Sequence, residues 1–179
     1  MTQQNDILLA DDHSKLDEIL EQVFEALKLD DRRQTFLNLD YFWALLAVHI
    51  RAEHLHLFRV LLQKVRAPGL PETLIDVVRR LPDDISTLKR DHDFFVREIG
   101  KDVNRLRVGD TEESGNLDLV GVQKNLIVVA QRLEDHNELE EKDIYPLAET
   151  LLTAEEITDL KVSIAMELAN IPPRLRSSL

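Results

Sequence analysis

Four of the six histidines in this chain occupy positions where a helical repeat of apolar residues would otherwise place leucines. Residues three or four apart share one face of a helix, and four stretches carry apolar residues at this spacing. Each stretch has a histidine within its apolar face, and two also have a glutamate. Buried carboxylates are costly without a partner, so these groups need one. A pair of metal ions is the simplest partner for these six residues: His13, His49, Glu53, His92, His136 and Glu140.

The composition fits a single helical domain. A chain of 179 residues is long enough for one domain with a sizeable core. It has five glycines and six prolines, and it shows little of the alternation of apolar and polar residues that is typical of strands. We therefore predict an all-α fold, an antiparallel up-down four-helix bundle with short additional helices. The expected domain covers residues 1–179, with the bundle core at about 9–150 and a C-terminal helix at about 153–169.

The net charge, the lack of long apolar runs and the absence of cysteine exclude or disfavour several classes of partner and site. A net charge of −12 disfavours nucleic acid and anionic membrane surfaces as partners. No run approaches the roughly 18 apolar residues of a membrane span, and the N-terminus lacks the basic start and apolar stretch of a signal peptide. Without cysteine, disulfides, thiolate zinc sites and cysteine-held iron–sulfur clusters are excluded. We expect a cytoplasmic protein with no nucleic-acid or membrane partner. The sequence is compatible with a homodimer.

Capping and turn residues mark the helices in the first half of the chain. Asp11 or Asp12 can cap the first helix, and Asp30-Asp31 marks the turn after it. Ala67-Pro68-Gly69 is a strong breaker that ends the second helix. The predicted helices cover about residues 11–28, 33–66, 71–80, 82–107, 117–150 and 153–168.

In the second half of the chain, prolines, a loop and a capping box mark where the predicted helices begin, bend and end. Pro82 suits the first turn of a long helix, since a proline there loses no intrahelical hydrogen bond. Residues 108–116 are the clearest loop. The helix after this loop, at about 117–150, should be kinked near Pro146. Thr153 with Glu156 forms a capping box for the last helix.

The four histidines fall at similar heights in the predicted bundle. For turns centred near residues 30 and 112, His13 and His49 lie 17 and 19 residues from the first turn. His92 and His136 lie 20 and 24 residues from the second. At about 1.5 Å per residue, antiparallel helices bring the members of each pair within roughly one turn of each other. The polar residues of all four helices should therefore share one slab of the bundle.

Two motifs put an imidazole and a carboxylate one turn apart on the same helix face. They are His49-x-x-x-Glu53 and His136-x-x-x-Glu140. A surface ion pair is the alternative for either motif alone, because such pairs are common on exposed helices. Two motifs plus two matched histidines favour a metal site instead. Four nitrogens and two carboxylates suit iron, manganese or zinc, and they are poor ligands for magnesium or calcium.

These residues also carry a family resemblance, which extends over roughly residues 9 to 160. The chain resembles the hemerythrin-like HHE cation-binding domains, which are four-helix bundles with a non-haem di-iron centre. The resemblance rests on Asp12-His13, His49-Ile-Arg-Ala-Glu53, Asp91-His92, His136-Asn-Glu-Leu-Glu140-Glu141 and Ile144-Tyr145-Pro146. It implies two iron ions, with manganese or zinc as possible substitutes. It makes the four histidines terminal ligands, and Glu53 and Glu140 bridging ligands.

The chain departs from the family pattern at two positions. His54 stands where a second glutamate is more usual, and Val96 stands where oxygen carriers have another histidine ligand. The resemblance implies a small ligand such as oxygen, nitric oxide or peroxide. Because Val96 leaves a ligand position open, we expect a protein that senses or consumes oxidants without storing oxygen reversibly. The alternatives are a stress-response protein that reduces oxidants or supplies iron for cluster repair, and a metal-free or zinc-bound interaction module.

Other residues near the motifs have weaker claims to a role in the site. His54 lies off the ligand face, which favours solvent or a helix interface, whereas His56 is an alternative ligand or supporting residue. Glu141 fits a solvated face better than a supporting role. The aromatic residues fit the core, and some of them could wall a pocket: Tyr41, Phe42, Trp43, Phe94, Phe95 and Tyr145. No metal role is assigned to three aspartates that directly precede histidines, since neighbours in sequence do not share a helix face: Asp12, Asp91 and Asp135.

Overall fold

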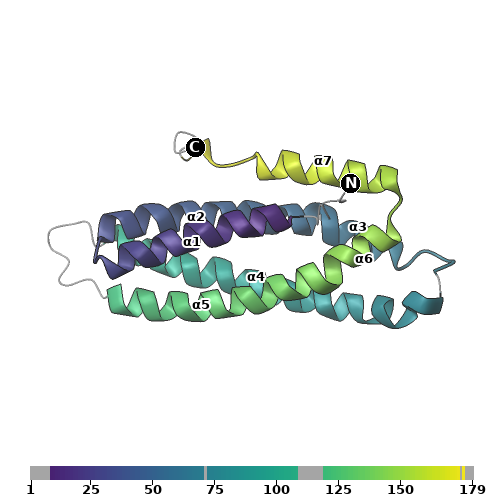
Figure 1. Cartoon of the computed structure of the whole chain (residues 1–179), viewed down its shortest axis with the longest axis horizontal. Coiled ribbons are helices and arrows are strands. Elements are labelled where there is room, and N and C mark those ends of the chain that lie inside the picture. Colours follow the sequence, from purple (N-terminus) through teal and green to yellow (C-terminus); the bar gives the residue numbers. More distant parts are fainter. Residues whose placement is uncertain (1–8, 71, 109–118, 174, 176–179) are drawn as a thin grey trace, which may run out of the picture.

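Four long helices lie side by side in this computed structural model, which describes residues 9–70, 72–108, 119–173 and 175 (Figure 1). The four helices are α1 (Ala10–Lys28), α2 (Arg32–Ala52), α4 (Ile75–Val108) and α5 (Leu119–Leu139). Each helix packs against the next, and α5 returns to contact α1, which closes the bundle. The predicted antiparallel four-helix bundle is confirmed, and the described residues contain no strand. No described helix is long and apolar enough to cross a membrane.

Two helices of the bundle continue through a single π turn. The turn η1 (Glu53–Leu57) joins α2 to α3 (Phe58–Lys64), and η3 (Glu140–Ile144) joins α5 to α6 (Tyr145–Leu151). In each, the carbonyl of the first residue accepts a hydrogen bond from the N–H five residues later. The second turn lies next to Pro146, which has no N–H to donate. The change in helix geometry expected near this proline therefore takes the form of a wider turn that begins at Glu140.

Helix α4 (Ile75–Val108) continues through Pro82, so the prediction of a helix boundary there was wrong. A short helix at 71–80 and a separate one from Pro82 were expected, but α4 runs without a break from Ile75, preceded by a 3-10 turn η2 (Glu72–Leu74). The proline costs the helix one hydrogen bond. Leu81 and Ile85 on either side of it are almost fully buried, at 1% and 2% exposure. Their packing holds the helix in place across the proline.

The caps of α1 and α2 differ from what the sequence suggested. Asp31, predicted only as part of the turn, caps α2 by accepting a hydrogen bond from the Gln34 N–H. Helix α1 begins after Leu9, which adopts a left-handed conformation and makes no side-chain cap. Asp11 or Asp12 was predicted to cap this helix, and that prediction was wrong because both residues already lie in its first turn. The predicted loop at 108–116 lies outside the described residues, apart from Val108 at the end of α4.

Helix α7 (Ala154–Leu168) lies outside the four-helix bundle and packs along α2 (Figure 1). Its predicted capping box is present, with Thr153 and Glu156 each accepting a hydrogen bond from the backbone N–H of the other. Leu160 and Ile164 are the buried residues of this helix, and Arg51 on α2 pairs with Glu167 near its end. The helix therefore covers the outer side of α2 with an apolar stripe and an ion pair.

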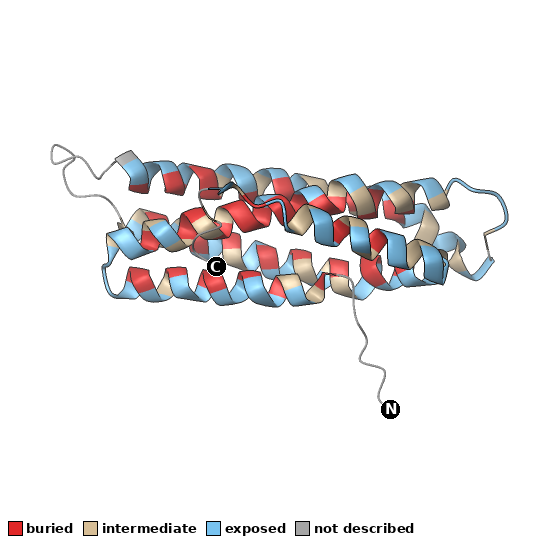
Figure 2. Ribbon diagram, turned by 90° about the horizontal axis from the view of Figure 1, so that it is seen from above, coloured by how far each residue is buried: buried red, intermediate tan, exposed pale blue. Residues whose placement is uncertain are grey.

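The buried residues lie on the inward faces of the helices, as the red colour shows (Figure 2). The apolar ones form two clusters, one toward each end of the bundle. Between the clusters, each helix changes from apolar to polar on its buried face. On α4, for example, Leu88 belongs to one cluster and Phe95 to the other, with His92 between them. The six candidate ligands lie in this intervening slab. The apolar clusters therefore enclose a polar site on both sides.

Candidate metal centre

The structure brings together all six residues that the sequence singled out, and none is more than 3% exposed. They form two groups of four, in which the candidate ligand atoms lie within 4.8 Å of one another. The first group is His13, His49, Glu53 and Glu140, and the second is Glu53, His92, His136 and Glu140. Both glutamates belong to both groups. Each group could hold a metal ion, and two such ions would share both carboxylates.

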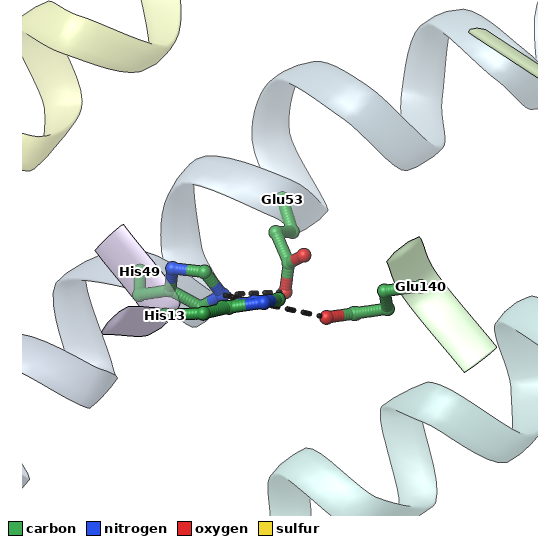
Figure 3. A group of neighbouring side chains, drawn as sticks. All are labelled: His13, His49, Glu53 and Glu140. Atoms are coloured by element: carbon green, nitrogen blue, oxygen red, sulfur yellow. Dashed lines mark hydrogen bonds and ion pairs between the residues drawn. The ribbon is translucent and has the colours of Figure 1, made fainter. Parts of the chain in front are cut away.

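Each of the four bundle helices contributes to the site at the same height. His13 comes from α1 and His92 from α4, whereas α2 and α5 each carry a histidine and, one turn later, a glutamate. Glu53 and Glu140 are the first residues of the two π turns. In the first group, side chains from three separate helical segments converge on one point (Figure 3).

The two glutamates lie between the histidine pairs. For Glu140, Oε2 is 3.4 Å from Nε2 of His13 and Oε1 is 3.2 Å from Nε2 of His136. For Glu53, Oε2 is 3.6 Å from Nε2 of His49 and 3.2 Å from Nε2 of His92. Each carboxylate thus contacts one histidine of either pair. Glu140 makes these contacts through its two oxygens, as a carboxylate between two ions would, whereas Glu53 makes both through Oε2.

The first histidine pair is held from outside by carboxylates. Nδ1 of His13 lies 2.8 Å from Oε1 of Glu141, and Nδ1 of His49 lies 2.8 Å from Oδ2 of Asp12. A carboxylate only accepts, so each Nδ1 donates its proton outward. When both rings are neutral, as metal binding requires, their Nε2 atoms are both acceptors, and these atoms lie 3.2 Å apart.

The second pair has different outer neighbours. Nδ1 of His92 lies 2.9 Å from Nε2 of His54. Nδ1 of His136 lies 3.5 Å from Oδ2 of Asp91, whose other oxygen accepts two hydrogen bonds from Arg132. The Nε2 atoms of this pair also face each other, at 3.0 Å.

The donor set fits a pair of metal ions. When the rings of a pair are neutral with the proton on Nδ1, their Nε2 lone pairs face each other with no proton between them. In addition, Glu53 Oε2 and Glu140 Oε1 are buried without a hydrogen-bond partner, and both point toward these nitrogens. Cations would satisfy all these lone pairs at once. Nitrogen with carboxylate oxygen is a suitable ligand set for iron, manganese or zinc.

Tyr145 is a further member of the site, which the sequence placed among core aromatics that could wall a pocket. It is fully buried, and its hydroxyl donates to Glu53 Oε1 at 3.0 Å and Glu140 Oε2 at 3.2 Å. Burial and the two nearby carboxylates raise its pKa well above the ordinary value. The tyrosine therefore keeps its proton and acts as a hydrogen-bond donor to both shared carboxylates.

Without metal, the cluster holds protons. Burial lowers the pKa of His13, but hydrogen bonds and charge interactions with Glu140 and Glu141 outweigh burial and raise it to about 9. Burial and the neighbouring Glu140 raise the pKa of Glu53 to about 8, whereas hydrogen bonds from His13 and His136 hold that of Glu140 low against its burial. Burial and the neighbouring His136 lower the pKa of His92 to about 3. Near pH 7, metal-free protein thus keeps protons on His13 and Glu53 that binding must displace.

Four residues have roles that the sequence interpretation denied or thought less favoured. Asp12 and Asp91 were assigned no metal role because they do not share a face with the histidines that follow them. They instead contact histidines on neighbouring helices, His49 and His136. Glu141, expected on a solvated face, bonds His13, and His54 bonds His92. The signal that could have found the two aspartates is an aspartate directly before a histidine on both α1 and α4. The third such aspartate, Asp135, is exposed.

Two other positions differ from expectation. His56 was considered as an alternative ligand, but its Nε2 lies 3.8 Å from Glu167 of α7, because the π turn rotates it away from the site. Val96 is 36% exposed, so its side chain does not fill a ligand position among the buried residues. Of the predicted core aromatics, Phe42 and Phe95 are fully buried, and Phe95 packs edge-on against His136.

A comparison with protein families matches residues 7–148 to the hemerythrin HHE cation-binding domain. The match covers most of the chain and includes all six candidate ligands, whereas α7 lies beyond it. Comparisons with curated proteins and with solved structures each gave no match.

Proposed function

The chain belongs to the hemerythrin HHE cation-binding domain family, and from that premise we propose that it holds a carboxylate-bridged pair of iron ions that reacts with oxygen, nitric oxide or peroxide. The observation that carries the proposal is the sharing of Glu53 and Glu140 by both ligand groups, each with one buried oxygen that lacks a hydrogen bond. In the proposal, His13 and His49 hold one ion, and His92 and His136 hold the other. Manganese or zinc could occupy the same ligands.

The proposed role is consumption or sensing of an oxidant. Two ferrous ions supply two electrons, which suffice to reduce one peroxide to two waters when two protons are added. The six protein ligands fill only part of the coordination of two ions, so positions stay open for a small molecule. The Tyr145 hydroxyl contacts both shared carboxylates and keeps its proton, which suits it to donate a hydrogen bond beside the reacting group.

The surroundings of the site support chemistry on small molecules. The apolar clusters on either side of the slab exclude bulk water from the six buried groups. Phe95 and Phe58 pack against the rings of His136 and His92, which limits the space beside that pair. A diatomic molecule or peroxide fits such a confined site better than a large organic substrate.

Anaerobic titration with hydrogen peroxide tests the proposal. Protein loaded with two ferrous ions per chain should consume one peroxide per chain, and metal-free protein should consume none. A His56→Gln variant serves as control, since this histidine lies outside the site. If the loaded protein instead takes up oxygen and releases it intact under vacuum over repeated cycles, the carrier function replaces this one. Protein that retains zinc and refuses iron would favour the interaction module.

A further inference from the structure

The two histidine pairs differ in the charge of the groups behind them. Behind His13 and His49 stand the carboxylates of Glu141 and Asp12, each 2.8 Å from an Nδ1 atom. Within the described part of the chain, these carboxylates form ion pairs only with those histidines. Two uncompensated negative charges therefore stand behind the first pair.

Behind the second pair the charges cancel. When His92 uses Nε2 as a ligand, its Nδ1 carries a proton that is donated to Nε2 of His54, so that nitrogen must be unprotonated and His54 neutral. Asp91 stands behind His136, but its carboxylate accepts bonds of 2.7 and 2.5 Å from Arg132 and lies 3.5 Å from the histidine nitrogen. One negative charge, one positive charge and one neutral ring add up to no net charge.

A carboxylate that accepts the outer proton of a histidine makes the ring a stronger metal ligand, and a neutral acceptor does so less. We propose that the two ion positions are unequal: the one between His13 and His49 fills first, and the one between His92 and His136 fills second because the neutral His54 supports it. This inference rests on the proposed dinuclear site. His54 acts here as a positioning residue that sets the affinity of the second position.

Removal of one outer partner changes metal affinity by about 10- to 100-fold in sites of this kind. The two positions differ at both of their outer partners. We therefore expect the two stepwise dissociation constants to differ by at least about tenfold, beyond the statistical factor for two equal sites. Repulsion between the two ions also widens the observed gap, so the variants below, and not the wild-type gap alone, measure the difference between the positions.

Calorimetric titration of metal-free protein with Co²⁺ tests the proposal. The wild type should bind two ions in two resolved steps. His54→Glu places a carboxylate behind His92 and should strengthen the second step about tenfold or more, with the first changed less than twofold. His54→Gln keeps a neutral acceptor and should behave as the wild type. Leu55→Glu, at an exposed position of the same π turn, adds the charge without contact and should change neither step.

Asp12→Asn provides the converse test, because it removes one charge from behind the first pair while it keeps an acceptor. It should weaken the first step and leave the second within about twofold. Two equal steps in the wild type would overturn the inequality and leave the dinuclear proposal intact. So would a His54→Glu variant in which neither step changes, or in which Leu55→Glu has the same effect. Failure to bind Co²⁺ or Fe²⁺ at all would overturn both proposals.

Discussion

Metal-free protein should become less stable as the pH rises from 7 to 9. The folded cluster keeps protons on His13, with a pKa of about 9 against 6.5 for the unfolded chain, and on Glu53, with about 8 against 4.5. Both pKa values are higher in the folded state. Their contribution to stability is therefore greatest at low pH and is lost as the pH rises through the folded values.

The size of the effect follows from these pKa values. Between pH 7 and 9, the loss is about 2 kcal/mol from His13 and about 1 kcal/mol from Glu53. The pKa of His92 is lower in the folded state, so its contribution to stability changes mainly below pH 6.5. It adds little to the loss of stability between pH 7 and 9. A total of about 3 kcal/mol corresponds to a fall in melting temperature of about 10 °C for a chain of this size.

Urea unfolding at pH 7, 8 and 9, with a chelator present, measures the change. The unfolding free energy of metal-free protein should fall at each step, and His13→Gln should remove about two thirds of the fall. His56→Gln, outside the site, should leave it unchanged. Metal-loaded protein should show the opposite slope, because ligands must lose protons to bind. A metal-free stability that is flat or rises over this range would show that the folded cluster does not hold these two protons.

Three further predictions concern single residues of the site. Glu53→Ala or Glu140→Ala should remove both ions together, since each carboxylate belongs to both groups, whereas the exposed Glu138→Ala should retain two ions by elemental analysis. Tyr145→Phe should keep two ions, because the hydroxyl is a donor, but should lower the unfolding free energy by about 2 kcal/mol, as measured in urea; an unchanged value would contradict its role. Val96→His should change neither the metal content nor the visible spectrum, because the position is exposed, and a new nitrogen ligand in the spectrum would disprove this.

Much of the fold could be predicted from the sequence because helix periodicity is local. Apolar residues three and four apart define which face of each helix is buried, and loop positions set the height of each residue. These two kinds of information placed His13, His49, His92 and His136 in one slab. The continuous course of α4 through Pro82 could not be predicted, since the proline signal is local whereas the packing of its neighbours is not.

The outer part of the site could not be predicted because it depends on contacts between helices. Periodicity tells which residues share a face on one helix, but not which residue of a neighbouring helix faces them. The contact of Asp12 with His49 joins α1 to α2, so the sequence of either helix alone could not predict it. The π turns had a similar effect, since the extra residue in η1 rotates His56 toward α7. Tyr145 lies beyond η3, so its direction also depended on a turn that the sequence did not reveal.

We propose that one chain holds two ions bridged by shared carboxylates. Iron analysis combined with X-ray absorption, on protein that was loaded anaerobically and freed of excess metal, tests this directly. Such a site should give two irons per chain and a metal–metal distance of about 3.5 Å, as in other two-metal sites. One iron per chain, or two irons without a metal–metal signal, would contradict this proposal.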